Sequence, residues 1–378
     1  MPTAINKTGK VSSAGKFMLI CNLFAAFTLL VSQAAPLVSP ERFWYMELMA
    51  FAYPFLLFIN LLFLAYWGFR RHRFFFISAA IILMGYDKLV QLYQPHIFSM
   101  DVKHPKDAVK VMSYNVRLFD LYNWTGNKKS RDKIIRMLQQ EHPDILCLQE
   151  YFHADKGDFN NNDTLRDVLH LNHSTITYGI TLRKIHHWGL ATFSKYPIID
   201  EGKVFFEEGK TNFGIYSDLI IEKDTVRVYN VHLQSNHFKE QDYHFIANPD
   251  SGDNDELIRG TKGILSRIKR SVSKRSQQVD ELALHISNSP YPVILCGDFN
   301  DPPFTYAYQS LRKVLRDAYI EKGKGFGATY IGLPVKFRID YILHSPEIAV
   351  HTYQTKIRKY SDHYPITAWI SIDKNPKK

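Results

Sequence analysis

The sequence has few cysteines and none of the short motifs that mark several large classes of enzyme. Its three cysteines, Cys21, Cys147 and Cys296, each lie within an apolar run. These positions predict small buried side chains rather than a disulfide set or a thiolate metal site. The sequence has no glycine-rich phosphate loop, histidine-rich zinc motif or Gly-x-Ser-x-Gly element. Their absence argues against nucleoside triphosphatases, zinc hydrolases and serine esterases.

The chain also lacks the concentrated positive charge of a protein that coats nucleic acid. Its formal net charge is +10 over 378 residues. Residues 1–100 carry eight Lys or Arg against three acids, which is +5, so only +5 remains for the other 278 residues. This mild excess is weak evidence for an anionic partner.

Long apolar runs, uncharged apart from Glu47, fill most of the first hundred residues. Residues 17–38 and 43–68 are each long enough for a spanning helix, which needs about 20 apolar residues. A third run, residues 74–86, is shorter and spans only if Lys88 extends its amine to the interface. We therefore expect a multi-pass membrane protein with about three spans.

Positive charges give the expected orientation. Lys7, Lys10 and Lys16 precede the first run, and three arginines lie within residues 70–73. By the positive-inside rule both segments are cytoplasmic, so three spans place the rest of the chain on the extracytoplasmic side. A cleaved signal peptide is the alternative for the first run, because lysines precede it and Ser32-Gln33-Ala34 offers small residues for cleavage. The further apolar runs favour an anchored chain.

The sequence divides into a membrane region at 1–94, a short linker at 95–107 and a soluble domain at 108–373. Within the soluble domain, residues 236–256 form a polar insertion, for which a solvated loop is favoured over a calcium site. Residues 257–285 predict a strongly basic helix. Its basic face is expected to be solvated, with anionic headgroups or a phosphorylated substrate as the alternative.

Short apolar strands in the soluble domain end in polar residues. The clearest is Pro292–Cys296, which leads directly into Gly297-Asp298-Phe299-Asn300. The polar residues at the ends of the predicted strands are Asn115, Glu150, His232, Asp298 with Asn300, Asp340, and Asp362 with His363. Such strand ends are where α/β folds place their chemistry. Helices separate only some of the strands, so we expect two packed sheets with helices outside.

These residue types favour hydrolytic chemistry with a hard cation. Carboxylates and amides without cysteine ligands select Mg²⁺ or Mn²⁺. Glu150 is the best single ligand, because an unpaired carboxylate at the end of an apolar strand is costly. Asp362 offers a second ligand or an orienting group. Asp340 could orient His363 as in other hydrolases, and His232 could protonate a leaving oxygen.

The same motifs, taken in order, resemble the endonuclease/exonuclease/phosphatase superfamily of DNase I-like phosphoesterases. The matching segments are Ser113–Asn115, Leu148–Glu150, Gly297–Asn300, Arg338–Ile342 and Ser361–Pro365. The resemblance covers residues 108–373. It implies an α+β fold, a four-layer αββα sandwich of two mixed sheets with outer helices, which here follows an N-terminal transmembrane region. It also implies Mg²⁺-dependent hydrolysis of phosphoesters, in a membrane-anchored member of bacterial type.

The resemblance also implies metal and support roles. Glu150 would hold the metal, with Asn115 and Asp362 nearby. Arg275 and Gln278 resemble a recurrent Arg-x-x-Gln on the helix before the Gly-Asp-x-Asn strand. There we expect structural or backbone-orienting work.

Five further residues receive catalytic roles from the resemblance. Asp298 would orient or deprotonate the attacking water, and Asn300 would bind phosphate. Asp340 would pair with His363, which stabilises the transition state. Histidine at 232 resembles the DNase I-like and phosphatase members, whereas the apurinic endonuclease branch typically has tyrosine there.

The substrate stays open between nucleic acid and a lipid or polyol phosphate. The membrane tether leans toward a substrate at the membrane. Arg338–Tyr341 stands where inositol polyphosphate 5-phosphatases carry a different element, which leaves that assignment without support. A catalytically inactive membrane scaffold is the non-enzyme alternative, but it predicts a missing ligand or base, and none is missing. We expect the bilayer and a phosphate ester as partners, and no obligate protein partner.

Overall fold

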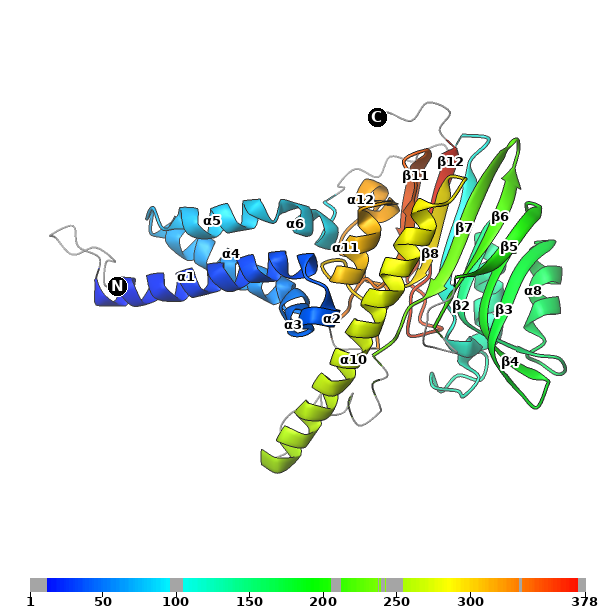
Figure 1. The fold of residues 1–378 in the computed structure, drawn as a ribbon, viewed down its shortest axis with the longest axis horizontal. Coiled ribbons are helices and arrows are strands. Elements are labelled where there is room, and N and C mark those ends of the chain that lie inside the picture. Colours follow the sequence, from blue (N-terminus) through cyan, green and yellow to red (C-terminus); the bar gives the residue numbers. More distant parts are fainter. Residues whose placement is uncertain are drawn as a thin grey trace.

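The computed structural model describes residues 12–95, 105–204, 212–236, 238, 242, 254–332 and 335–372. Most of the polar insertion at 236–256 therefore lies outside the described residues. An N-terminal group of helices lies on one side of the molecule, and two packed β-sheets lie on the other (Figure 1). Helices of the second part lie between the sheets and the N-terminal group.

The N-terminal group contains six α-helices. They are α1 (Ser13–Ala34, continued by the 3₁₀ turn η1, Ala35–Leu37), α2 (Pro40–Phe43), α3 (Tyr45–Phe51), α4 (Tyr53–Phe69), α5 (Phe75–Met84) and α6 (Tyr86–Leu92). The continuous segment Ser13–Leu37 is long and apolar enough to cross a membrane. The other two expected spans are each broken, with a bend of 53° between α3 and α4 and of 70° between α5 and α6.

The first sheet contains six strands in the order β11-β12-β1-β2-β4-β3. Their bounds are β1 Val109–Asn115, β2 Ile145–Ala154, β3 His173–Leu182, β4 His186–Ser194, β11 Ile348–Thr355 and β12 Ile366–Ile372. The pair β1 and β2 is parallel, and the other neighbours are antiparallel.

The second sheet repeats this plan in the order β5-β6-β7-β8-β10-β9. Its strands are β5 Ile198–Val204, β6 Gly214–Ile221, β7 Asp224–His232, β8 Val293–Asp298, β9 Arg316–Asp317 and β10 Asp340–His344. Here β7 and β8 form the parallel pair. Arg338 and Ile339 lead into β10.

Three hydrophobic layers hold these elements together. Between the sheets, alternate strand residues such as Val111, Val228 and Ile342 face one another. The outer face of the first sheet packs on α7 (Ser130–Glu141) and α8 (Asn161–Leu169). The outer face of the second sheet packs on α10 (Asn254–Ser287) and α11 (Tyr306–Arg312). The helices η2 (Arg117–Asp120) and α12 (Ala318–Lys322) are shorter. The layer order confirms the expected αββα sandwich.

Candidate active site

Strand direction explains why the polar strand ends meet. Each sheet contains one central parallel pair, β1 with β2 and β7 with β8, whose carboxyl ends lie at the same edge. In the second sheet His232 is paired in register with Asp298. Strand β10 is antiparallel to β8, so it contributes its first residue, and Asp340 lies opposite Asp298. The two sheets therefore present their functional groups at one edge of the sandwich.

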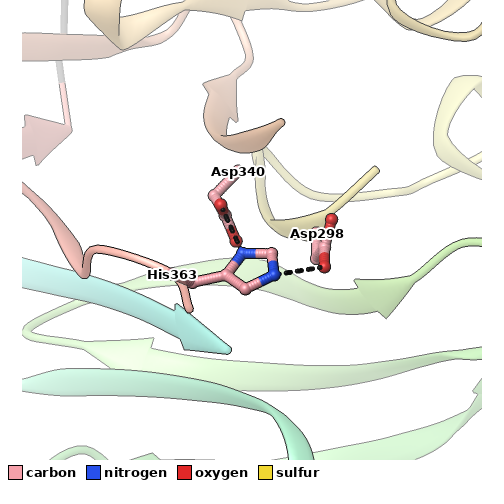
Figure 2. Close-up of side chains that lie close together, drawn as sticks. All are labelled: Asp298, Asp340 and His363. Carbon is pink, nitrogen blue, oxygen red and sulfur yellow. Dashed lines mark hydrogen bonds and ion pairs between the residues drawn. The ribbon is translucent and has the colours of Figure 1, made fainter. Parts of the chain in front are cut away.

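Asp340, His363 and Asp298 form a chain of contacts at this edge. Nδ1 of His363 lies 2.9 Å from a carboxylate oxygen of Asp340, and its Nε2 lies 3.6 Å from Oδ2 of Asp298. Figure 2 shows the imidazole ring between the two carboxylates. All three side chains are buried. A buried imidazole held by a carboxylate is oriented to act on a proton or to carry positive charge.

The surroundings shift the pKa values of both end groups of this chain. Burial acts to lower the pKa of His363, but the carboxylates of Asp340 and Asp298 outweigh it and raise that pKa well above its usual range. Burial raises the pKa of the Asp298 carboxyl, and the charge of His363 offsets part of this rise. Desolvation favours the neutral acid, whereas opposite charge favours the ionised pair. The two carboxylates therefore favour the cationic form of His363.

Asn115 connects the first sheet to this chain. Its amide nitrogen donates to Asp298 Oδ2 at 2.9 Å and to Glu150 Oε1 at 3.3 Å. Nε2 of His232 lies 3.8 Å from the same two carboxylates. The Glu150 side chain is about one third exposed, so part of it is in contact with solvent. The structure thus brings together six of the eight predicted site residues: Asn115, Glu150, His232, Asp298, Asp340 and His363.

The other two predicted residues lie beside this group and have different partners. The Asn300 side chain donates to the backbone carbonyl of Leu233 at 3.0 Å, and its backbone N–H donates to Asp298 at 2.8 Å. Asp362 lies 3.3 Å from the Arg117 guanidinium. Asn300 therefore holds the loop after β8 in place. The Asp362 carboxylate pairs with the positively charged Arg117 side chain.

The backbone is strained at several points around the site. Glu150 and Asn300 have φ values of +47° and +54°, in the left-handed region. Such conformations cluster at functional sites, where the surrounding structure enforces them. Four consecutive residues of η2, Arg117–Asp120, also have positive φ. Asp120 stabilises this turn by accepting from the Thr125 backbone at 3.2 Å. Sequence reasoning missed this turn, since no glycine marks it.

The structure also shows support residues that the strand-end pattern did not identify. Arg275 and Asp301 form a buried ion pair at 2.7 Å. Arg275 also donates to the carbonyl of Gln234, and Gln278 accepts from the Gln234 N–H at 2.8 Å. These contacts agree with the backbone-orienting work expected of Arg275 and Gln278.

The fold and the site together define a phosphoester hydrolase of the DNase I-like class. The chain belongs to the Endonuclease/Exonuclease/phosphatase family, whose model matches residues 112–363. Residues 15–92 match a second family, described as Domain of unknown function (DUF8431). None of the curated proteins compared with the chain matches it.

Solved structures share the fold at low sequence identity. A family member from Bacteroides thetaiotaomicron is 17% identical with a TM-score of 0.50, over 74% of this chain and 99% of that one. A humanized D. rerio TDP2 is 15% identical with a TM-score of 0.50, over 70% and 100% of the two chains. ANGEL2, a 2',3'-cyclic phosphatase in complex with adenosine-2',3'-vanadate, is 16% identical with a TM-score of 0.49, over 73% and 99%.

Proposed function

We propose that this chain is a membrane-anchored, metal-dependent phosphoesterase in which water attacks the phosphorus of a phosphate ester. The observation that carries the proposal is the chain Asp340–His363–Asp298, joined through Asn115 to Glu150. It brings together the His363 imidazolium, the buried Asp298 carboxylate and the partly exposed Glu150 carboxylate. Burial of these charged groups costs stability. A network without a catalytic role would carry this cost with no functional gain.

The residues present fit a divalent cation with oxygen ligands. Glu150 is the principal ligand in this proposal, beside Asn115, whose amide donates to it at 3.3 Å. Asp362, which pairs with Arg117 at 3.3 Å in this structure, is a further candidate ligand. Nε2 of His232 and one oxygen of Asp340 are buried without a hydrogen-bond partner among the described residues. Carboxylate and amide oxygens are the ligands that suit Mg²⁺ or Mn²⁺. A bound cation would polarise a phosphoryl oxygen and offset its charge.

Asp298, Asp340 and His363 offer a second set of ligand atoms, which lie within 4.8 Å of one another. We prefer the Glu150 end for the metal. His363 Nδ1 already bonds to Asp340, and Asp298 already accepts from Asn115. A cation placed among these three side chains would compete with the bond between His363 and Asp340, whereas Glu150 is open to solvent.

Each residue of the cluster then has a chemical task. Asp298 accepts a proton from the attacking water, and its raised pKa brings it closer to the working pH of a general base. The His363 imidazolium, held cationic by Asp340, faces the negative charge that develops on the phosphoryl oxygens. His232 donates a proton to the leaving oxygen. The second N–H of the Asn300 amide remains for a phosphate oxygen.

We further propose that the helices anchor the domain on the extracytoplasmic side. The proposal rests on the apolar segment Ser13–Leu37, on the positive charges of residues 7–16 and 70–73, and on two further spans formed by the bent helix pairs. A topology reporter fused after Lys378 should be active only outside the cytoplasm. Activity confined to the cytoplasm would contradict this orientation.

A substrate panel tests the function and separates the open substrate classes. Full-length protein in detergent would be given DNA, a choline or glycerol phosphodiester and inositol phosphates, with Mg²⁺, Mn²⁺ or chelator. We expect metal-dependent hydrolysis of at least one class, and its loss in Glu150→Ala and His363→Ala. Asp167→Ala, on the outer helix α8, is the matched control and should keep full activity. A folded protein that hydrolyses no member of the panel would instead support the inactive scaffold.

A further inference from the structure

The loop after β8, residues 299–305, lies between α10 and the N-terminal helices. On one side, the buried Arg275 of α10 pairs with Asp301 at 2.7 Å. On the other side, the backbone N–H of Tyr306 donates to a carboxylate oxygen of Glu47 at 3.0 Å. The rings of Phe304 and Tyr53 lie 5.4 Å apart in the same contact. Glu47 and Tyr53 belong to α3 and α4, about 250 residues earlier in the chain.

A second contact reaches the segment that leads into Asp340. The Arg338 guanidinium is buried and pairs with Asp317 at 2.7 Å. It also donates to the backbone carbonyl of Gln91 in α6 at 3.3 Å. The Gln91 side chain accepts from Gln309 of α11 at 2.6 Å. Both segments that carry the carboxylates on either side of His363 therefore rest on the N-terminal helices. In Figure 1, α6 and α2 lie against α11 and α10.

Glu47 is the most costly element of this contact. Its side chain is 2% exposed, and one of its carboxylate oxygens has no hydrogen-bond partner among the described residues. Burial of an incompletely satisfied carboxylate destabilises a fold. An anchor alone needs no such residue, since apolar packing would hold the two parts together at lower cost. The other oxygen, however, fixes the first N–H of α11, which follows the β8–α11 loop directly.

We infer that the N-terminal helices form part of the catalytic unit, and that Glu47 is a positioning residue for the loop at 299–305. This loop follows Asp298 and carries Asn300. This inference rests on the hydrolytic role proposed for that loop. Glu47 holds the start of α11, Arg275 holds Asp301, and together they fix where Asp298 and Asn300 meet the substrate. The region 15–92 thereby receives a function beyond attachment to a membrane.

Kinetics of the full-length protein test the positioning role. Glu47→Ala removes the acceptor for Tyr306, so kcat should fall about 10- to 100-fold with KM changed little, because catalytic groups move while substrate contacts remain. Glu47→Gln keeps an oxygen acceptor and should restore most of kcat. Asp87→Asn, an exposed carboxylate of α6, is the matched control and should equal the wild type. Equal kcat per folded molecule in Glu47→Ala and wild type would overturn the inference.

A binding measurement tests the same contact without using activity. A protease site would be inserted between residues 100 and 101, and the cut protein run on a sizing column in mild detergent. The two fragments should elute together, and Glu47→Ala should weaken their association. Separation of the wild-type fragments overturns this inference alone, whereas absence of hydrolysis in every variant overturns only the proposed function. If Glu47→Ala does not fold, Gln91→Ala serves the same two measurements.

Discussion

His363 and Asp340 are both buried, and they lie in direct contact. An isolated charge at this depth would cost several kcal/mol. Their contact at 2.9 Å compensates that cost, and Asp298 adds a second negative neighbour at 3.6 Å from the other ring nitrogen. The excess of negative charge around the ring explains why the pKa of His363 rises despite burial. In the proposed function, the positive charge of this pair lies next to the phosphate of the substrate.

Removal of the Asp340 charge should change the pH dependence of hydrolysis. In Asp340→Asn the imidazolium loses its largest stabilising neighbour, so the pKa of His363 falls. The cationic form is then lost at lower pH, and the alkaline limb of the kcat profile should move to lower pH. The check is a pH–rate profile at saturating metal. An alkaline limb at the wild-type position would contradict the role given to His363.

At this scale the sequence identified residue types but not their partners. Polar residues at strand ends are visible because the preceding apolar run is unmistakable, as at Asp298 and Glu150. The pairing of Asp301 with Arg275 was not visible, because two residues 26 positions apart in the sequence meet only through the packing of α10 on the sheet. For the same reason nothing in the sequence pointed from Glu47 to Tyr306.

Strand β8 shows at the element scale why one glycine is required. Gly297 is paired in register with Val231 of the parallel strand β7. A Cβ atom at position 297 would lie 2.2 Å from the Val231 carbonyl oxygen, a backbone atom that cannot turn aside. The two strands that carry His232 and Asp298 can therefore approach only with glycine at this position.

Gly297→Ala should accordingly destabilise the protein by about 3 kcal/mol, as expected for an overpacked site inside a sheet. Thermal unfolding in detergent would show a lowered midpoint. Gly263→Ala in α10 is the control, since a Cβ atom there meets only the flexible Arg267 side chain at 3.3 Å, and alanine favours helix. The account of β8 is wrong if the two variants unfold at the same temperature.

Helix α7 ends in an ion cluster with a defined pH dependence. Glu141 contacts Lys110 at 2.8 Å and Lys356 at 3.0 Å. Burial acts to raise the pKa of Glu141, but hydrogen bonds from the two lysines outweigh it and lower that pKa below its usual 4.5. A lowered pKa means that the ionised form stabilises the fold at neutral pH, and that this stabilisation is lost as pH falls below that value.

Glu141→Gln should therefore cost about 1 kcal/mol at pH 7, after allowance for partial solvent screening. The difference from wild type should vanish as the pH falls from about 5 to 3, because the wild-type carboxylate is then protonated as well. Denaturant unfolding at several pH values provides the check. A difference that stays constant with pH would show that the charge of Glu141 contributes nothing.

Central elements were predicted better than edge elements. The strand expected at Pro292–Cys296 overlaps β8, and the helix expected at 257–285 lies within α10, because both segments have strong patterns. The sequence did not reveal β3 or β5, which are half exposed and polar along much of their length. Their place in the sheets depends on antiparallel pairing with β4 and β6, which a local pattern does not report.

At the scale of the whole molecule, the sequence predicted two kinds of part but treated them as independent. Apolar runs and strand patterns separate the N-terminal helices from the sandwich without difficulty. The contacts that join them are made by Glu47 and Gln91, two polar residues of the N-terminal helices. Such residues carry no signal until the folded chain brings their partners to them. The bends of 53° and 70° lie beside Pro54 and Gly85, and the hydropathy of the runs does not record them.

Metal-dependent turnover by an Asp298→Asn variant tests the central claim most directly. This change keeps the size of the side chain and removes the base that accepts the proton of water. We predict that the folded full-length variant binds metal and loses at least about 100-fold in kcat on the substrate found in the panel, while the matched Asp167→Asn variant keeps the wild-type rate. Undiminished turnover in Asp298→Asn would contradict hydrolysis at this site.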